Sequence, residues 1–97
     1  MTGGEILVAS LRREGVEVVF GLPGVQIYGV MAALRNERRI RFIATRHEQA
    51  TTYMADGYAR AGGNVGAALV VPGPGLFNAA SGLSTAYACS SPVLLIV

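Results

Sequence analysis

Short apolar runs and helical stripes of apolar residues alternate along the whole chain. Four apolar runs predict β-strands, at residues 16–20, 40–44, 65–71 and 93–97. Four intervening or preceding segments predict helices: one that ends at Gly15, one around 27–34, one over 48–60 and one over 76–88. Strands that alternate with helices favour an α/β fold, in which a parallel sheet carries helices on both faces in a flavodoxin-like, doubly wound arrangement.

The last apolar run continues to the final residue. Such a continuous run is typical of a strand that is buried on both faces of a parallel sheet. A domain that ends inside a strand is unusual, so we expect the fold to be incomplete at the C-terminus. Residues 1–97 are then the N-terminal portion of a single domain.

Local patterns refine the expected helices. The spacing of Thr2 and Glu5 predicts a capping box at the first helix. Asp56 and Arg60 are spaced for an ion pair along the third helix. The apolar stripe expected for the third helix comprises Ala50, Tyr53, Met54, Gly57, Tyr58 and Ala61. The stripe expected for the fourth helix comprises Ala79, Ala80, Leu83 and Tyr87.

Composition limits the classes of function. Of the 97 residues, 52% are hydrophobic and 14% are charged, which indicates a surface that further protein covers. The net charge is only +2, and we interpret the sole basic cluster as a solvated helix end and turn. We therefore expect no nucleic-acid partner. The cluster consists of Arg35, Arg38, Arg39 and Arg41.

Cellular location is constrained by the same sequence. Cys89 is the single cysteine, which excludes an internal disulfide and a cysteine-cluster metal site and fits a reducing compartment. We expect Cys89 to be a small core residue. No run reaches membrane-spanning length and no signal peptide is evident. We therefore expect a cytoplasmic protein without a membrane partner, and no metal ligands in this chain.

Candidate chemistry gathers where strands end. Ligands of open α/β sheets bind outside the carboxyl ends of the strands, which here lead into loops 21–24, 45–48 and 72–75. Glu48 stands out because small residues follow it and no cation lies one turn further on. A carboxyl group stabilised by the helix dipole is the structural alternative. His47 has no nucleophile placed beside it, and loop 72–75 matches no phosphate-binding motif.

Three segments together resemble a known family. Residues 20–24 (FGLPG), 46–60 with its RHEQA and ADGYAR stretches, and 73–78 (GPGxxN) are similar to the pyrimidine-binding domain of thiamine-diphosphate enzymes, most closely the acetolactate synthase group. The resemblance implies that Glu48 hydrogen-bonds N1′ of the cofactor's aminopyrimidine. That contact promotes the 4′-imino tautomer, which removes the proton from C2 of the thiazolium. The implied substrates are 2-oxo acids.

The resemblance also assigns cofactor contacts. It implies that the aminopyrimidine is bound by Leu22, Pro23, Gly24, Glu48, Val71, Pro74 and Asn78. Each has a structural alternative: a strand-core residue, a turn former or a helix cap. The chain departs from the acetolactate synthase pattern in two of these motifs. At 21–25 that pattern is Gly-Tyr-Pro-Gly-Gly, whereas this chain has Leu22 and Val25 at the second and fifth positions. At 72–75 the pattern is Ser-Gly-Pro-Gly, whereas this chain begins with Pro72.

The remaining parts of a thiamine-diphosphate site are expected elsewhere. The resemblance implies that a later domain holds Mg²⁺ and the diphosphate, and that a second subunit of a homodimer or homotetramer supplies it. The fragment alone is then expected to be inactive, and whether FAD is present is open. The alternative is a small flavodoxin-like binding module without catalysis.

Overall fold

A four-stranded parallel β-sheet lies at the centre of the molecule, with strand order β2-β1-β3-β4. The computed structural model describes residues 1–62 and 64–97. The strands are β1 (Val18–Gly21), β2 (Arg41–Ala44), β3 (Gly66–Leu69) and β4 (Val93–Ile96). The helices are α1 (Gly3–Arg13), α2 (Tyr28–Asn36), α3 (Glu48–Gly62) and α4 (Pro74–Ala88), with a short 3₁₀ helix η1 (Val25–Ile27) before α2.

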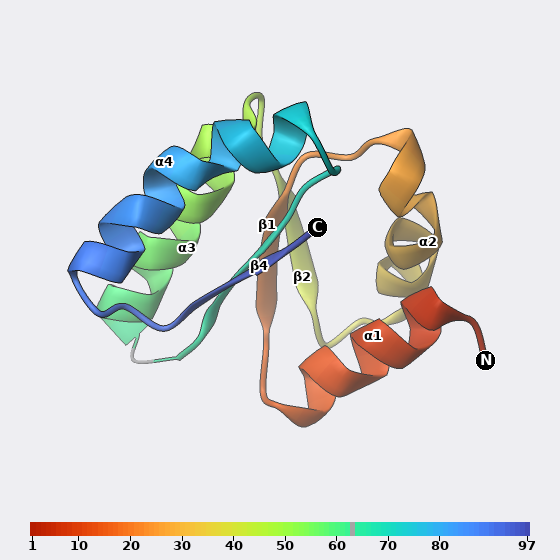
Figure 1. The fold of residues 1–97 in the computed structure, drawn as a ribbon. Helices are drawn as coiled ribbons and strands as arrows, with labels where there is room; N and C mark the ends of the chain where they lie inside the picture. The colour runs from red at the N-terminus through yellow and green to blue at the C-terminus, as the bar shows by residue number, and fades with distance from the viewer. Residues whose placement is uncertain (63) are drawn as a thin grey trace.

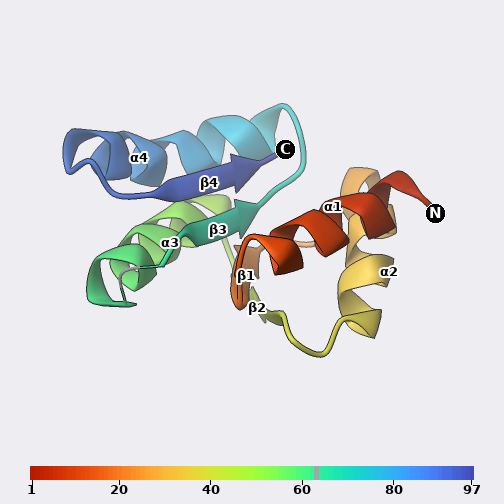
Figure 2. The same ribbon diagram turned by 90° about the horizontal axis from the view of Figure 1, so that it is seen from below.

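The helices form one layer on each face of this sheet. Figures 1 and 2 show α1 and α2 together on one side and α3 and α4 together on the other. Val19 and Leu69 belong to the apolar core beneath α1 and α2, whereas Phe20 and Ala68 belong to the core beneath α3. Successive residues of one strand therefore point to opposite faces, as the pleat requires. The α/β doubly wound prediction is confirmed.

The carboxyl ends of the strands are aligned at one edge. Gly21, at the end of β1, pairs with Ala44 of β2 and with Leu69 of β3, and Leu69 pairs with Ile96 of β4. Figure 2 shows β3 and β4 running side by side in the same direction. The loops that follow β1, β2 and β3 consequently leave the sheet at the same edge.

The buried face of α3 differs from the predicted stripe. Thr51, Thr52, Ala55, Asp56 and Ala59 are its buried residues. Tyr53 and Met54, which the stripe placed inside, are exposed, as are Gly57 and Ala61. The stripe was wrong for these four residues because it left out the two threonines, whereas Tyr58, which it also included, does pack against Phe20. Both threonine hydroxyls donate to backbone carbonyl groups, so their burial leaves no donor unsatisfied.

Helix α4 also begins and packs differently from the prediction. It starts at Pro74, two residues earlier than expected, so Pro74 and Gly75 are helical rather than part of a loop. Its buried residues are Gly75, Ala79, Gly82 and Ala86, whereas Tyr87 is 89% exposed. Cys89, expected in the core, is exposed. Small residues face α3 because the two helices pack closely.

Two local predictions are confirmed. Thr2 and Glu5 form the capping box: the Glu5 backbone N–H donates to the Thr2 hydroxyl, and the Thr2 N–H donates to the Glu5 carboxylate. The Arg60 guanidinium donates to both carboxylate oxygens of Asp56. The four residues of the basic cluster are also exposed: Arg35 lies in the last turn of α2 and Arg38 and Arg39 lie in the turn, as expected, whereas Arg41 begins β2.

Candidate functional site at the carboxyl edge of the sheet

The segment between β2 and α3 places Glu48 at the first position of α3. The Thr45 hydroxyl is buried and donates to the His47 carbonyl at 2.9 Å. His47 Nδ1 accepts a hydrogen bond from the Gln49 backbone N–H at 3.1 Å. This N–H is one of the amides at a helix start that lack a partner within the helix. His47 therefore caps α3 and fixes where Glu48 leaves the backbone.

Glu48 meets Asn78 across the two helices. The Asn78 side-chain amide donates to Glu48 Oε2 at 3.1 Å. Glu48 is half-buried and Asn78 is exposed. The two residues are 30 positions apart in sequence, and they meet because α3 and α4 both begin at the carboxyl edge of the sheet. The hydrogen bond orients one carboxylate oxygen of Glu48 at the carboxyl edge of the sheet.

A second group of contacts joins the loops after β1 and β3. Val71 is half-buried and packs between two glycines. A Cβ atom on Gly24 would overlap Val71 Cγ1, and one on Gly75 would lie 2.8 Å from Val71 Cγ2. Leu22 donates its backbone N–H to the Leu69 carbonyl at 3.2 Å. The loops that follow β1 and β3 thus pack closely against each other, with the side chain of Val71 between them.

The predicted site residues therefore fall into two groups on one edge. Glu48 and Asn78 form a hydrogen-bonded pair, and Gly24 packs on Val71. Within residues 1–62 and 64–97 no side-chain hydrogen bond joins these two groups. Pro23 and Pro74 are exposed. Pro74 occupies the first turn of α4, where its missing N–H costs no helical hydrogen bond.

The sequence interpretation did not identify three residues that shape this edge. Thr45 holds the turn before α3, and Thr52 of α3 packs against Gly82 of α4, where a Cβ atom would overlap its hydroxyl group. Spacing along one helix carries no signal for a contact between helices, so the pairing of Thr52 with Gly82 required the structure.

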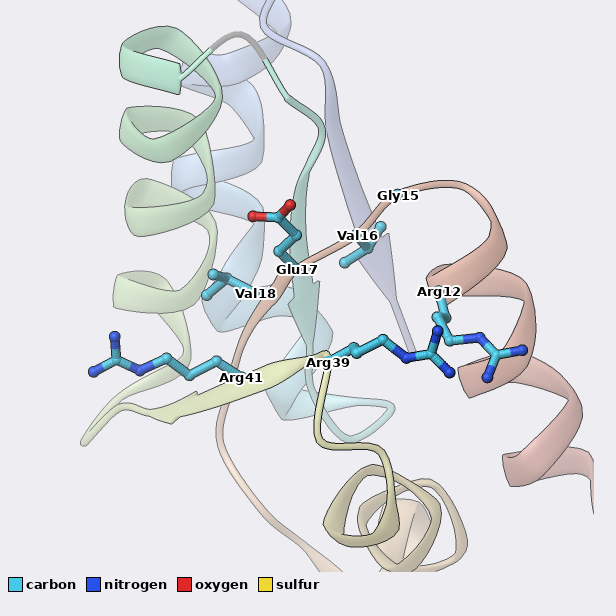
Figure 3. A pocket seen from close by; sticks show the side chains of 7 residues that line it. All are labelled: Arg12, Gly15, Val16, Glu17, Val18, Arg39 and Arg41. Carbon is cyan, nitrogen blue, oxygen red and sulfur yellow. The ribbon is translucent and has the colours of Figure 1, made fainter.

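A separate hollow of about 520 Å³ lies at the opposite edge of the sheet. Figure 3 shows its lining: Arg12, Gly15, Val16, Glu17, Val18, Arg39 and Arg41. Arg12 and Arg39 lie 3.3 Å and 3.4 Å from the Glu37 carboxylate. The Arg39 backbone N–H, followed by the two guanidinium groups, lowers the pKa of Glu37. Two of the three arginines that line the hollow are thus paired with Glu37, so their presence there is explained by ion pairs within the fold.

The described residues hold neither a metal-binding cluster nor a membrane-spanning helix. Within residues 1–62 and 64–97, no three side chains of histidine, cysteine, aspartate or glutamate gather as a metal site. Over the same residues, the helices are too short or too polar to cross a bilayer.

Comparison with known proteins matches the whole chain to one family. The model described as "Thiamine pyrophosphate enzyme, N-terminal TPP binding domain" covers residues 1–97. The acetolactate synthase large subunit of Haemophilus influenzae is 49% identical over 96 residues, which are 99% of this chain and 17% of that protein.

Two further relatives show the range of the family. The acetolactate synthase isozyme 3 large subunit of Escherichia coli is 45% identical over 99% of this chain and 17% of its own length. The probable 2-ketoarginine decarboxylase AruI of Pseudomonas aeruginosa is 45% identical over the same shares. The chain thus spans about a sixth of the length of the relatives it matches. The chain belongs to the thiamine pyrophosphate enzyme family and corresponds to the N-terminal TPP binding domain of that family.

Proposed function

We propose that this chain is the pyrimidine-binding part of an acetolactate synthase-like enzyme that acts on 2-oxo acids, and that Glu48 is its acid–base residue. The supporting observation is the Glu48–Asn78 pair at the carboxyl edge of the sheet. This is the edge at which open α/β sheets bind their ligands. The carboxylate is half-buried, so a bound molecule can reach it.

The residues at this edge fit an aminopyrimidine. Such a ring has flat apolar faces, an exocyclic amino donor and a ring nitrogen that shares a proton with a carboxyl group. Glu48 offers the carboxyl group, Val71 offers an apolar contact, and the loop at 22–24 follows β1 at the same edge of the sheet. Asn78 holds one carboxylate oxygen in place, which lowers the cost of orienting the acid–base group when a ligand binds.

Each residue then has a defined role. When bound, thiamine diphosphate supplies a nucleophilic carbon that adds to the carbonyl group of a 2-oxo acid, and an electron sink for the bond that breaks. Glu48 holds and returns the proton at the pyrimidine ring nitrogen. Asn78 orients Glu48. Leu22, Pro23, Gly24, Val71 and Pro74 pack against or hydrogen-bond to the ring.

Other parts of the enzyme supply the rest of the site. The resemblance to thiamine-diphosphate enzymes leads us to propose that a later domain holds Mg²⁺ and the diphosphate. We propose that a second subunit contributes this domain within a homodimer or homotetramer in the cytoplasm. The 97-residue chain by itself is then inactive, because it holds only the uncharged half of the cofactor.

A second reaction type has specific support. AruI, a probable 2-ketoarginine decarboxylase, is as similar to this chain as the Escherichia coli acetolactate synthase. Leu22 and Pro72 also depart from the acetolactate synthase pattern. Decarboxylation of a 2-oxo acid without carbon–carbon bond formation is therefore the second candidate. Product analysis with pyruvate and with basic 2-oxo acids separates the two reactions.

The decisive variant for Glu48 is Glu48→Gln in the full-length enzyme. Glutamine keeps the size of the side chain and can still contact Asn78, but it cannot exchange a proton with the ring. We expect the exchange of the cofactor's C2 proton for deuterium, followed by NMR after acid quench, to slow by at least about 10²-fold, the lower range for loss of an acid–base group.

The matched control is Glu17→Gln at the opposite edge of the sheet. Glu17 is exposed and lines the hollow beside Arg39, so its substitution leaves the C2 exchange rate at the wild-type value. An unchanged exchange rate in Glu48→Gln would remove Glu48 from the mechanism.

A further inference from the structure

We propose that Thr52 is a positioning residue that holds Glu48 and Asn78 in register through a hydrogen bond between α3 and α4. This inference rests on the proposed role of Glu48. It concerns a residue that neither the sequence motifs nor the family match singles out. Three observations carry it: the burial of Thr52, its bond to α4, and the placement of Gly82.

Thr52 links the two helices through its hydroxyl group. The side chain is fully buried at 0% exposure. Its Oγ1 donates to the Ala79 carbonyl at 2.6 Å, and its contact to the Gln49 carbonyl of its own helix is longer, at 3.3 Å. A hydroxyl group has one hydrogen to donate, and the shorter contact takes it. The bond therefore fixes α4 against α3.

Gly82 makes this close approach possible. A Cβ atom at position 82 would overlap the Thr52 hydroxyl and would lie 2.6 Å from the Tyr53 backbone nitrogen. Any side chain there would push the helices apart. Because interiors are close-packed, the Thr52–Gly82 contact sets the separation of α3 and α4 at this level.

The register of the helices carries this contact to the site. Thr52 lies four residues after Glu48, and Gly82 lies four residues after Asn78. Residues four apart lie on the same helix face, one turn from each other. The Glu48–Asn78 pair consequently lies one helical turn from the Thr52–Gly82 contact, toward the start of both helices. Ala79, whose carbonyl group accepts the hydrogen bond from Thr52, directly follows Asn78 in sequence. Loss of the bond at Thr52 shifts Asn78 relative to Glu48.

Thr52→Val in the full-length enzyme tests this role, because valine keeps the shape of threonine and removes the hydroxyl group. We expect the C2 exchange rate at saturating thiamine diphosphate and Mg²⁺ to fall about 10-fold or more, since a misplacement of about 1 Å costs up to about 10²-fold. The dissociation constant for thiamine diphosphate, measured by calorimetry, should change much less than the exchange rate. A crystal structure of the cofactor-free variant should show Asn78 Nδ2 beyond hydrogen-bond distance from Glu48 Oε2.

Thr51→Val is the matched control. Thr51 is the neighbouring residue and is equally buried, but its hydroxyl donates to the Glu48 carbonyl within α3 at 2.6 Å. This substitution removes a hydroxyl without breaking a link to α4, so the exchange rate should stay near the wild-type value. Thr52→Ser keeps the hydroxyl and should restore exchange. If Thr52→Val does not fold, Thr52→Ala replaces it, with the same expected loss.

The outcomes separate this inference from the proposed function. Slow exchange in both Glu48→Gln and Thr52→Val, with normal exchange in Thr51→Val and Thr52→Ser, supports both. Slow exchange in Glu48→Gln with wild-type exchange in Thr52→Val overturns the positioning role alone. Equal losses in Thr51→Val and Thr52→Val also overturn it, because the effect then follows the loss of any buried hydroxyl. Wild-type exchange in Glu48→Gln overturns the proposed function and the positioning role together.

Discussion

At the scale of single residues, Asp56 is a buried carboxylate that forms an ion pair with Arg60. Its side chain is 3% exposed, whereas that of Arg60 is 51% exposed. The hydrogen bonds from Arg60 lower the pKa of Asp56 below its ordinary value of 3.8. A carboxyl group whose pKa is lower in the folded state stabilises that state above its unfolded pKa, and the stabilisation is lost as the pH falls.

The pH dependence of unfolding tests this ion pair. We expect the difference in urea midpoint between the wild type and Asp56→Asn to be constant above about pH 5. It should narrow as the pH falls below 3.8, because a protonated Asp56 pairs no better with Arg60 than asparagine does. The control Glu14→Gln alters an exposed side chain and should show no comparable difference. A gap that stays constant down to pH 2 would contradict the assignment.

The sequence predicted some of the contacts at the candidate site and gave no signal for others. Glu48 and Asn78 were predicted as separate contacts of one cofactor, and the structure places them in a hydrogen bond. His47, for which the sequence offers no neighbouring nucleophile, caps α3. Thr52 could not be assigned, because its importance comes from the carbonyl group of a residue 27 positions away. No spacing rule within one helix encodes that distance.

At the scale of elements, helix α3 shows how a stripe of apolar residues misleads. Tyr53 and Met54 are apolar but exposed. Their neighbours Thr51 and Thr52 are buried, because each hydroxyl group has a carbonyl partner. Burial in this helix follows size and satisfied hydrogen bonds rather than hydropathy. Close packing against Gly82 of α4 favours small residues on the inner face at this level.

Helix α4 depends on one backbone conformation at its start. Gly73 precedes the helix with φ 72° and ψ −121°, a region that residues with a Cβ atom rarely adopt. We expect Gly73→Ala to lower the free energy of unfolding by about 1–3 kcal/mol, the cost of forcing a non-glycine residue into such a region. Urea denaturation followed by circular dichroism measures it.

Gly29→Ala is the control for this substitution. Gly29 lies in α2, and a Cβ atom there would meet no atom within 4 Å. Alanine favours a helix over glycine by up to about 1 kcal/mol, so this variant should be neutral or more stable. A Gly73→Ala variant as stable as Gly29→Ala would show that the start of α4 tolerates a side chain.

At the scale of the whole molecule, the alternation of strands and helices was sufficient to predict the layers and the shared edge of the loops. In a parallel sheet all strands run in the same direction, so their carboxyl ends lie at one edge whatever the strand order. The order β2-β1-β3-β4 could not be predicted, because apolar runs do not encode which strands are neighbours. The structure places β1 and β3 at the centre of the sheet, where Ala67 and Ala68 of β3 are fully buried.

We propose that this fold presents Glu48 to the aminopyrimidine of the cofactor, while the charged half of the cofactor is bound by other parts of the protein. A crystal structure of the full-length enzyme with thiamine diphosphate and Mg²⁺ tests it most directly. We predict a Glu48 carboxylate oxygen at about 3 Å from the pyrimidine N1′, within hydrogen-bond distance, with Mg²⁺ and the diphosphate held by residues outside positions 1–97. A cofactor ring bound away from the carboxyl edge, or a Glu48 carboxylate beyond hydrogen-bond distance of N1′, would contradict the account.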